Sequence, residues 1–188
     1  MKRDYSCWKE SMVKIDDYSL RPVQDEDIES IRIWRNAQLD VLRQKEPITV
    51  EQQSMYFEKH IWPSMKLLQP SNILVSFFYK DNLIGYGGLV HISWQDLRAE
   101  MSFLLDPKYT IEEEKYSDLF SVYIALLKKM AFEQLGFHRL FTETFEIRSH
   151  HISVLEKNGF IREGLMKDHV IISGKYVNSI IHGSINSK

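Results

Sequence analysis

The chain has 188 residues, of which 44% are hydrophobic and 12% aromatic, enough for one folded domain and too apolar for a disordered chain. The formal net charge is −2 and no basic tract is present, so the electrostatic signature of a nucleic-acid-binding protein is missing. Cys7 is the only cysteine, which excludes an internal disulfide and a thiolate zinc site. We expect one domain in a reducing compartment, with no nucleic acid among its partners.

The first residues carry no apolar core of the kind that a signal peptide needs. The longest apolar run, Ile73–Tyr79, is far too short to cross a bilayer. The sequence therefore predicts a cytoplasmic protein with no membrane partner.

Residues 1–17 are polar and are predicted to form an N-terminal arm ahead of a domain that spans residues 18–188. A first strand is expected at Tyr18–Pro22. A helix is expected from Asp25, because apolar side chains follow at helical spacing at Ile28, Ile31 and Trp34. Thr49 is a candidate N-cap for a second helix.

Two apolar stretches, residues 73–79 and 83–92, are separated by a short polar turn and predict a β-hairpin. Residues 98–105 continue the sheet. The second stretch contains a GxGG run, Gly85, Gly87 and Gly88. No helix follows this run, so it indicates a bulge or a close backbone approach rather than a phosphate loop.

Residues 118–135 carry the strongest helical stripe, which consists of Leu119, Val122, Tyr123, Leu126, Leu127 and Met130. Gly136 is placed to end this helix. A strand at 138–145, a helix at 149–157 and two strands within 160–185 complete the order. This order predicts a single α/β domain with a mixed sheet of about six to seven strands, flanked by about four helices.

Three segments resemble the GNAT family of acyl-CoA-dependent N-acetyltransferases. They are LGFHRLFTETF at 135–145, SVLEKNGFIREGLMKDHV at 153–170 and KYVNSIIHGSI at 175–185. The resemblance covers roughly residues 18–185. Trp34, Arg35 and Asn36 also resemble the WRN of one branch, which contains ribosomal-protein N-terminal alanine acetyltransferases and amino-sugar N-acetyltransferases of flagellin and surface-glycan pathways.

The resemblance implies acetyl-CoA as co-substrate, bound in a slot where two neighbouring strands splay. The pantetheine arm is then expected to pair with a free strand edge formed by Ser102, Phe103, Leu104 and Leu105. The pyrophosphate is expected at the amides that begin the next helix, here predicted at Ser117, Asp118 and Leu119.

The turn before that helix departs from the family pattern, because it lacks glycine and holds three glutamates at residues 112–114. Arg148 stands where the family often has asparagine, and Leu155 stands where it has the tyrosine that protonates the CoA thiolate. Three outcomes stay open. The glutamates form a solvated bulge beside working amides, Arg148 replaces the lost contact, or the slot takes another acyl carrier or none.

Strand alternation within residues 98–105 places Glu100, Ser102 and Leu104 on one face of the sheet. A carboxylate there can take a proton from an amine acceptor, so Glu100 is the candidate general base. Alternatively, Glu100 is an ordinary charge on an edge strand.

Four residues are candidates for the acceptor site, Trp34, Arg35, His91 and Trp94. The resemblance places Trp34 and Arg35 on one wall of the acceptor pocket and His91 and Trp94 near the other. An aromatic ring beside a charge suits a sugar or a peptide end, and Arg35 suits a diphosphate or an acidic peptide. Trp34 is alternatively a core residue, because it continues the apolar stripe of its helix.

His150 and His151 resemble a metal pair, but adjacent residues on a helix point about 100° apart. No third ligand lies near them in the sequence, so we expect no metal cofactor.

Two classes of function remain open. The first is transfer of an acetyl group from acetyl-CoA to a primary amine, on a nucleotide-linked amino sugar or, less favoured, on a protein N-terminus or a small amine. The second is a degenerate GNAT domain that acts as a non-catalytic binding or regulatory module. An open slot favours the first, and a slot filled by residues 108–117 favours the second. The resemblance leaves a homodimer open as an assembly.

Overall fold

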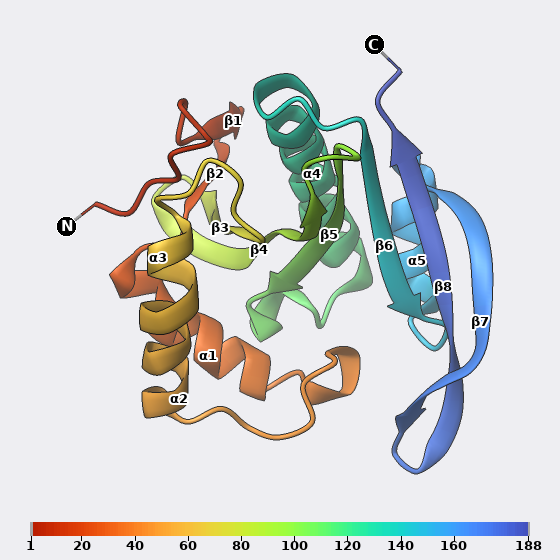
Figure 1. Ribbon diagram of the computed structural model, residues 1–188. Helices are drawn as coiled ribbons and strands as arrows, with labels where there is room; N and C mark the ends of the chain where they lie inside the picture. The colour runs from red at the N-terminus through yellow and green to blue at the C-terminus, as the bar shows by residue number, and fades with distance from the viewer. Residues whose placement is uncertain (1, 188) are drawn as a thin grey trace.

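A mixed sheet runs through the centre of the molecule, which a computed structural model describes for residues 2–187 (Figure 1). The strand order is β1-β2-β3-β4-β5-β6-β8-β7, and β5 with β6 is the parallel pair. The strands are β1 Val13–Ile15, β2 Tyr18–Pro22, β3 Ile73–Tyr79, β4 Asn82–Ser93, β5 Arg98–Leu105, β6 Arg139–Phe145, β7 Ile161–Ile172 and β8 Lys175–Ile185. The sheet has 8 strands, more than predicted, because β1 lies in the segment that was expected to be an arm.

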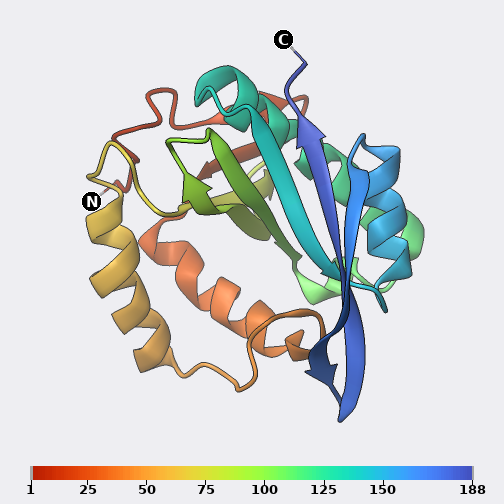
Figure 2. The same cartoon turned by 45° about the vertical axis from the view of Figure 1, so that its right-hand side comes forward.

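Helices cover both faces of this sheet (Figures 1 and 2). The helices are α1 Ile28–Asn36, α2 Val50–Tyr56, α3 Trp62–Ser64, α4 Glu113–Lys128 and α5 Ser149–Lys157. A π-helical turn at Phe57–Ile61 joins α2 to α3, and another at Lys129–Gln134 extends α4. The first group, α1 to α3, lies on one face, and α4 and α5 lie on the other. The predicted α/β architecture is confirmed.

The N-terminal segment packs against the domain. Tyr5 and Trp8 are buried, and Val13 belongs to the same core. The Tyr5 hydroxyl accepts a hydrogen bond from the Leu74 N–H at 2.8 Å, and Trp8 Nε1 donates to Gln134 at 2.8 Å. These two buried aromatic side chains therefore anchor the N-terminal segment to the domain, although most of the segment is polar.

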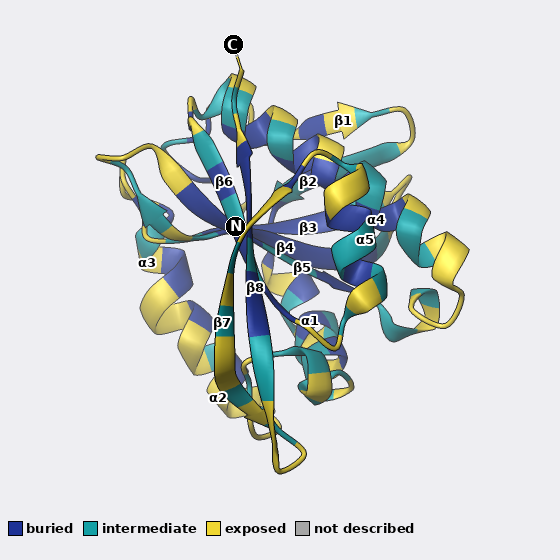
Figure 3. Ribbon diagram, turned by 90° about the vertical axis from the view of Figure 1, so that its right-hand side faces the viewer, coloured by how far each residue is buried: buried dark blue, intermediate teal, exposed yellow. Residues whose placement is uncertain are grey.

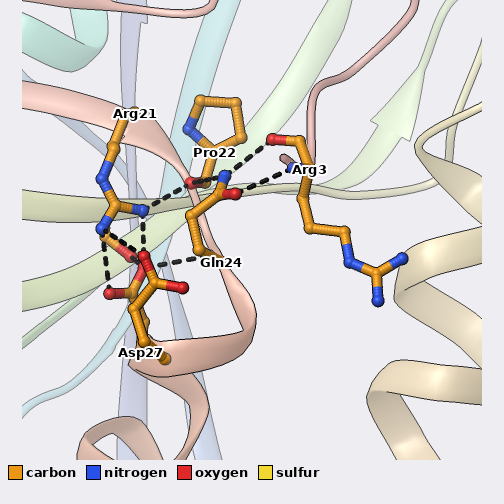
Figure 4. Close-up of polar contacts among 7 residues, drawn as sticks. Arg3, Arg21, Pro22, Gln24 and Asp27 are labelled. Atoms are coloured by element: carbon orange, nitrogen blue, oxygen red, sulfur yellow. Dashed lines mark hydrogen bonds and ion pairs between the residues drawn. The ribbon is translucent and has the colours of Figure 1, made fainter. Parts of the chain in front are cut away.

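A buried carboxylate fixes the start of α1 (Figure 4). Asp27, only 2% exposed, accepts hydrogen bonds from Arg21 at 2.8 Å, from the Gln24 N–H at 2.9 Å and from Ser76 at 2.6 Å. The Gln24 amide in turn donates to the Arg3 carbonyl at 2.7 Å. Paired buried charges hold geometry well, so α1 leaves the sheet in a fixed direction, which sets the position of its far end.

The hairpin of β3 and β4 forms as predicted, and its glycines allow a close backbone approach. A Cβ atom on Gly87 would lie 2.2 Å from the Ser102 carbonyl oxygen and 2.3 Å from the Tyr123 hydroxyl. That hydroxyl donates to the Ser102 carbonyl at 2.8 Å. Gly88 has a φ of +133°, a conformation that other residues rarely adopt. The prediction of a close approach rather than a phosphate loop is confirmed.

Candidate active site

The parallel strands β5 and β6 pair over only three residues each. Residues 98–100 pair with residues 139–141, and the register goes no further. Beyond Glu100 the two strands diverge, which leaves the β6-facing side of β5 without a strand partner. This is the strand splay that the sequence resemblance implies.

Three neighbouring cavities, which share lining residues, lie in order from the α5 side of the sheet, through this splay, to the α2 side. The slot cavity, about 210 Å³, lies between β5 and β6. The α5 cavity, about 530 Å³, lies between the starts of α4 and α5. The α2 cavity, about 600 Å³, lies between α1, α2 and the sheet. Val41, Arg148 and His151 line both the α5 and slot cavities, and Arg35, Tyr86, Val90 and Ser102 line both the slot and α2 cavities.

Glu100 lies in the slot cavity, where it is only 7% exposed. Its carboxylate accepts a hydrogen bond from Arg43 at 2.8 Å and lies 2.6 Å from His91 Nδ1. Arg43 also donates to Glu143 of β6 at 3.0 Å, so one guanidinium bridges both sides of the splay. Glu100 is therefore a buried, charge-paired side chain on an interior strand rather than an ordinary edge-strand charge.

Arg35 lies at the junction of the slot and α2 cavities. Its Nε donates to Gln44 at 2.9 Å, and Nη1 donates to the Tyr86 hydroxyl at 3.4 Å. Among residues 2–187 no carboxylate forms an ion pair with it. A half-buried guanidinium without a charge partner is a strong candidate for binding an anion.

A cluster of polar side chains from α4 and α5 borders the slot cavity at its α5 end, away from Arg35. The Tyr116 hydroxyl lies 2.6 Å from His151 Nδ1, and Arg148 Nη2 lies 3.3 Å from the same nitrogen. The His151 ring stacks on Phe120 with centroids 4.3 Å apart. Burial raises the pKa of Tyr116 above its ordinary value. Burial, and then the positive charge of Arg148, hold the pKa of His151 well below 6.5, so this imidazole is neutral near pH 7.

Acidification below about pH 6.5 is expected to destabilise the protein through His151, because the unfolded chain binds a proton that the folded chain excludes. Stability should fall as the pH drops from about 6.5 toward the folded pKa, by up to about 1.4 kcal/mol per pH unit. Thermal melts at about pH 7.5 and pH 5.5 measure this for the wild type and for His151→Gln, which cannot titrate. The wild type should lose more stability than the variant, and equal losses would contradict the expectation.

The helix that follows the glutamates starts earlier than predicted. α4 begins at Glu113, with Glu112 as N-cap, and its first bond to the cap runs from the Tyr116 N–H to the Glu112 carbonyl at 2.9 Å. Residues 117–119 therefore lie in the second turn, where helical hydrogen bonds use their N–H groups. The Ser117 hydroxyl bonds His150, Asp118 is exposed and Leu119 belongs to the core. The glutamates form the cap and first turn of the helix, not a bulge ahead of it.

Of the residues predicted to hold the cofactor, four line the slot cavity, Ser102, Phe103, Leu104 and Arg148. Leu105 does not line the slot cavity; it is buried, and its carbonyl accepts a hydrogen bond from Gln38 at 2.9 Å. The alternation of faces in β5 is confirmed, because Phe103 stacks on Phe120 of α4 while Glu100 turns toward Arg43.

Three of the four predicted acceptor residues line none of these cavities. Trp34 is 7% exposed and faces the core, which was its alternative interpretation. Trp94 Nε1 donates to the Pro70 carbonyl at 2.8 Å, and its ring packs on Phe137. His91 bonds Glu100 from outside the slot. Arg35 is thus the residue of this set that the structure brings to the cavities.

The sequence reasoning missed Arg43, Tyr86 and His151. Arg43 follows a short 3₁₀ turn with no periodic pattern, so nothing in the sequence marks it. Tyr86 stands inside the glycine run, which was interpreted only through its backbone. His151 was considered only as a metal ligand. Its position one helical turn before Leu155, on the same face of α5, was the available signal that it is buried.

Within residues 2–187, no group of three or more His, Cys, Asp and Glu side chains is placed to hold a metal ion. Over the same residues no helix is long and apolar enough to cross a bilayer.

A family model described as an acetyltransferase (GNAT) domain matches residues 20–181. The chain therefore belongs to the GNAT acetyltransferase family. It is an acyl-CoA-dependent N-acetyltransferase, with acetyl-CoA as the co-substrate that supplies the acetyl group. Comparison with curated proteins gives no match by sequence.

The fold is similar to that of solved spermidine N-acetyltransferases. The Vibrio cholerae enzyme in complex with CoA and spermine gives a TM-score of 0.78 at 18% identity, over 93% of this chain and 98% of that chain. Mutant forms of the Vibrio cholerae spermidine/spermine enzyme SpeG give 0.75 at 19% identity, over 92% and 96%. A chimera of SpeG and hSSAT gives 0.76 at 18% identity, over 90% and 96%. These structures lend no support to the branch predicted from residues 34–36.

Proposed function

We propose that this enzyme acetylates a primary amine that also carries an anionic group, with a nucleotide-linked amino sugar as the first candidate. The observation that carries the proposal is Arg35, which faces the α2 cavity without an acidic partner among the described residues. A guanidinium presents a fork of donors that matches a phosphate or carboxylate. Tyr56 and Tyr86 line the same cavity and offer faces against which a sugar or base can pack.

The series of cavities gives each substrate its own entrance. Acetyl-CoA enters through the α5 cavity, its pantetheine arm crosses the slot along β5, and the acetyl group arrives where the slot opens into the α2 cavity. The amine comes from the α2 side. Ser102 lies at that meeting point, on the strand edge that β6 leaves unpaired.

The pyrophosphate is assigned to the first turn of α4 together with Arg148. The N–H groups of residues 113–115 precede the first bond to the helix cap, so they are the amides available to an anion. Arg148 lines the α5 and slot cavities and adds a positive charge. This corrected position replaces the predicted amides of residues 117–119.

A polyamine acceptor is the second candidate, because it is what the similar solved structures are named for. The α2 cavity suits a polycation poorly. Glu46 is the acidic residue that lines it, and Arg35 places a positive charge in the same space. The Vibrio cholerae likeness is one of fold, and Arg35, which forms no ion pair among the described residues, favours an anionic acceptor over a polycation.

The non-catalytic alternative is weakened by the slot, which no residue of the 108–117 segment lines. Protein N-terminal acetylation remains an acceptor class for the same site, because Arg35 could also pair with an acidic peptide. One experiment tests both the non-catalytic alternative and the protein N-terminal acceptor.

Calorimetric titration with acetyl-CoA, followed by a thiol-release assay, tests the proposal. The amine panel contains a nucleotide-linked amino sugar, the free amino sugar, an acidic peptide with a free N-terminus, and spermidine. The anionic amino sugar should react faster than the free sugar. Preference for spermidine or for the peptide would replace the acceptor, and absence of acetyl-CoA binding at millimolar ligand would favour the non-catalytic module.

Changing Glu112, Glu113 and Glu114 together to glutamine is expected to tighten acetyl-CoA binding. The three exposed carboxylates surround the amides assigned to the pyrophosphate, and like charges repel most when salt is low. The gain should be roughly threefold to tenfold at low salt, the scale of a few exposed charges at a helix N-terminus, and should shrink as salt is raised. Calorimetric titration at two salt concentrations measures it.

The matched control changes three exposed glutamates that line none of the cavities, Glu10, Glu58 and Glu133. This control removes the same charge from elsewhere on the surface, so it should leave acetyl-CoA affinity nearly unchanged. An equal gain in both variants would show that net charge, not the first turn of α4, controls binding.

A homodimer is proposed on the open edge of β7, the last strand of the sheet (Figure 3). Ile161 and Ile171 on β7 and Tyr176 on β8 are more than half exposed. Unpaired strand edges with apolar side chains favour pairing with a second copy. Sedimentation measurements decide it, and a monomer at high concentration would rule it out.

A further inference from the structure

We propose that Tyr86 is the acid that protonates the departing CoA thiolate, a role that rests on the acetyl transfer described above. The need for such a group comes from α5. Leu155, which stands where the family has its proton donor, is fully buried in the core and carries no proton to give. Another side chain at the slot has to serve, or the thiolate leaves without help.

The position of the reacting atoms limits which side chain can donate the proton. The acetyl carbon reaches the amine where the slot opens into the α2 cavity. Three tyrosines line the cavities, and their places differ. Tyr116 lines the α5 cavity, Tyr56 lines the α2 cavity, and Tyr86 lines both the slot and the α2 cavity. Tyr86 alone among these three borders the point where the C–S bond breaks.

The surroundings of Tyr86 fit a proton donor. It is on β4, paired with Leu104 of β5, and is only 9% exposed. Arg35 Nη1 donates to its hydroxyl oxygen at 3.4 Å, and Arg35 Nε donates to Gln44 at 2.9 Å. The Arg35 guanidinium can therefore keep a hydrogen bond to this oxygen while the proton leaves.

The other polar groups of the slot are less suited. His151 is neutral because its pKa lies well below 6.5, and it borders the α5 end of the slot. Glu100 accepts a hydrogen bond from Arg43, and an ion-paired carboxylate carries no proton to give. Arg148 lines the α5 and slot cavities, where it is assigned to the pyrophosphate. Tyr86 is the group with both a transferable proton and the right position.

The step balances as follows. The amine nitrogen forms a bond to the acetyl carbon, and the C–S bond breaks with both electrons remaining on sulfur. The sulfur takes the Tyr86 hydroxyl proton, and the amine proton is removed by the base. The base then releases the amine proton to water, and water returns a proton to the phenolate. The products are the acetylated amine and CoA thiol, with no oxidant or reductant involved.

Binding of the product tests this without any acceptor. A phenolic O–H that faces the sulfur hydrogen-bonds its thiolate form more strongly than its thiol form. The affinity of the wild type for CoA, divided by its affinity for desulfo-CoA, should therefore rise about tenfold between pH 7 and pH 9, across the usual thiol pKa of about 8.5. Calorimetric titration of both ligands at each pH gives this ratio.

Tyr86→Phe should abolish the rise while leaving desulfo-CoA affinity and the melting temperature nearly unchanged. Tyr79→Phe is the matched control, because it removes the same hydroxyl from an exposed side chain that lines none of the three cavities, and it should behave like the wild type. With any amine that the wild type acetylates, Tyr86→Phe should also lower kcat about 10- to 100-fold, within the lower range for one acid–base group.

A flat affinity ratio in the wild type, or an unchanged rise in Tyr86→Phe, overturns the proposal. These results are separate from the acceptor. If the affinity ratio rises with pH and the rise depends on Tyr86, but anionic amines are not acetylated, only the proposed acceptor is contradicted. If those amines are acetylated but the affinity ratio stays flat, only the role of Tyr86 is contradicted.

Discussion

Replacement of Glu100 with glutamine is expected to lower turnover about 10- to 1000-fold while leaving acetyl-CoA affinity nearly unchanged. The carboxylate is buried in the slot, on the strand edge along which the cofactor is assigned. Glutamine keeps the shape but accepts a proton far less readily. Steady-state kinetics with thiol release and calorimetric titration with acetyl-CoA separate the two quantities.

The control for this variant is Glu143→Gln. Glu143 shares the guanidinium of Arg43 with Glu100, so its removal also weakens the bridge across the splay. If turnover falls because the bridge is lost, both variants should fall alike. If Glu100 takes the amine proton, only its own replacement should have the large effect. An unaltered rate in Glu100→Gln would reduce it to a structural charge.

Replacement of Arg35 with glutamine should raise the KM for an anionic amine about 10- to 100-fold, because a hydrogen bond to a charged group contributes about 1.5–3 kcal/mol. The KM for an uncharged amine should change far less. The ratio of the two KM values is the measurement to use, since Arg35 also contacts Tyr86 and both acceptors share any loss in chemistry.

Lys59→Gln is the matched control for Arg35. Lys59 lies on the π-helical turn after α2, is exposed and lines none of the three cavities. The Lys59→Gln substitution removes one positive charge from the same region without changing a residue that lines the cavities. A rise in KM that is equal for charged and uncharged amines would contradict anion recognition by Arg35.

Periodic patterns predicted most of the elements. β3 and β5 occupy the predicted residues, and α5 is Ser149–Lys157 as predicted. The start of α4 was misplaced because its first turn is exposed and adds nothing to the apolar stripe that begins at Leu119. Its cap, Glu112, makes no side-chain hydrogen bond, so no capping signal was present. The packing of Tyr5 and Trp8 was invisible because isolated aromatic residues have no period.

The site was predictable only in part. Alternation along one strand is local, and it placed Glu100 on the correct face of β5. Its partner Arg43 is 57 positions away along the chain, in an irregular loop, and the same guanidinium contacts Glu143 across 100 positions. Contacts of that range depend on how the sheet closes around the loop. No pattern in a short window contains that information.

The short ladder between β5 and β6 makes the sheet a scaffold of two parts that meet along a seam. Three residues on each strand, the covering helices and the Arg43 bridge hold the seam in the free protein. The amides of a bound pantetheine arm would add hydrogen bonds to β5 where β6 makes none. A ligand that binds only the folded chain stabilises it by mass action, so the cofactor doubles as part of the protein's own framework.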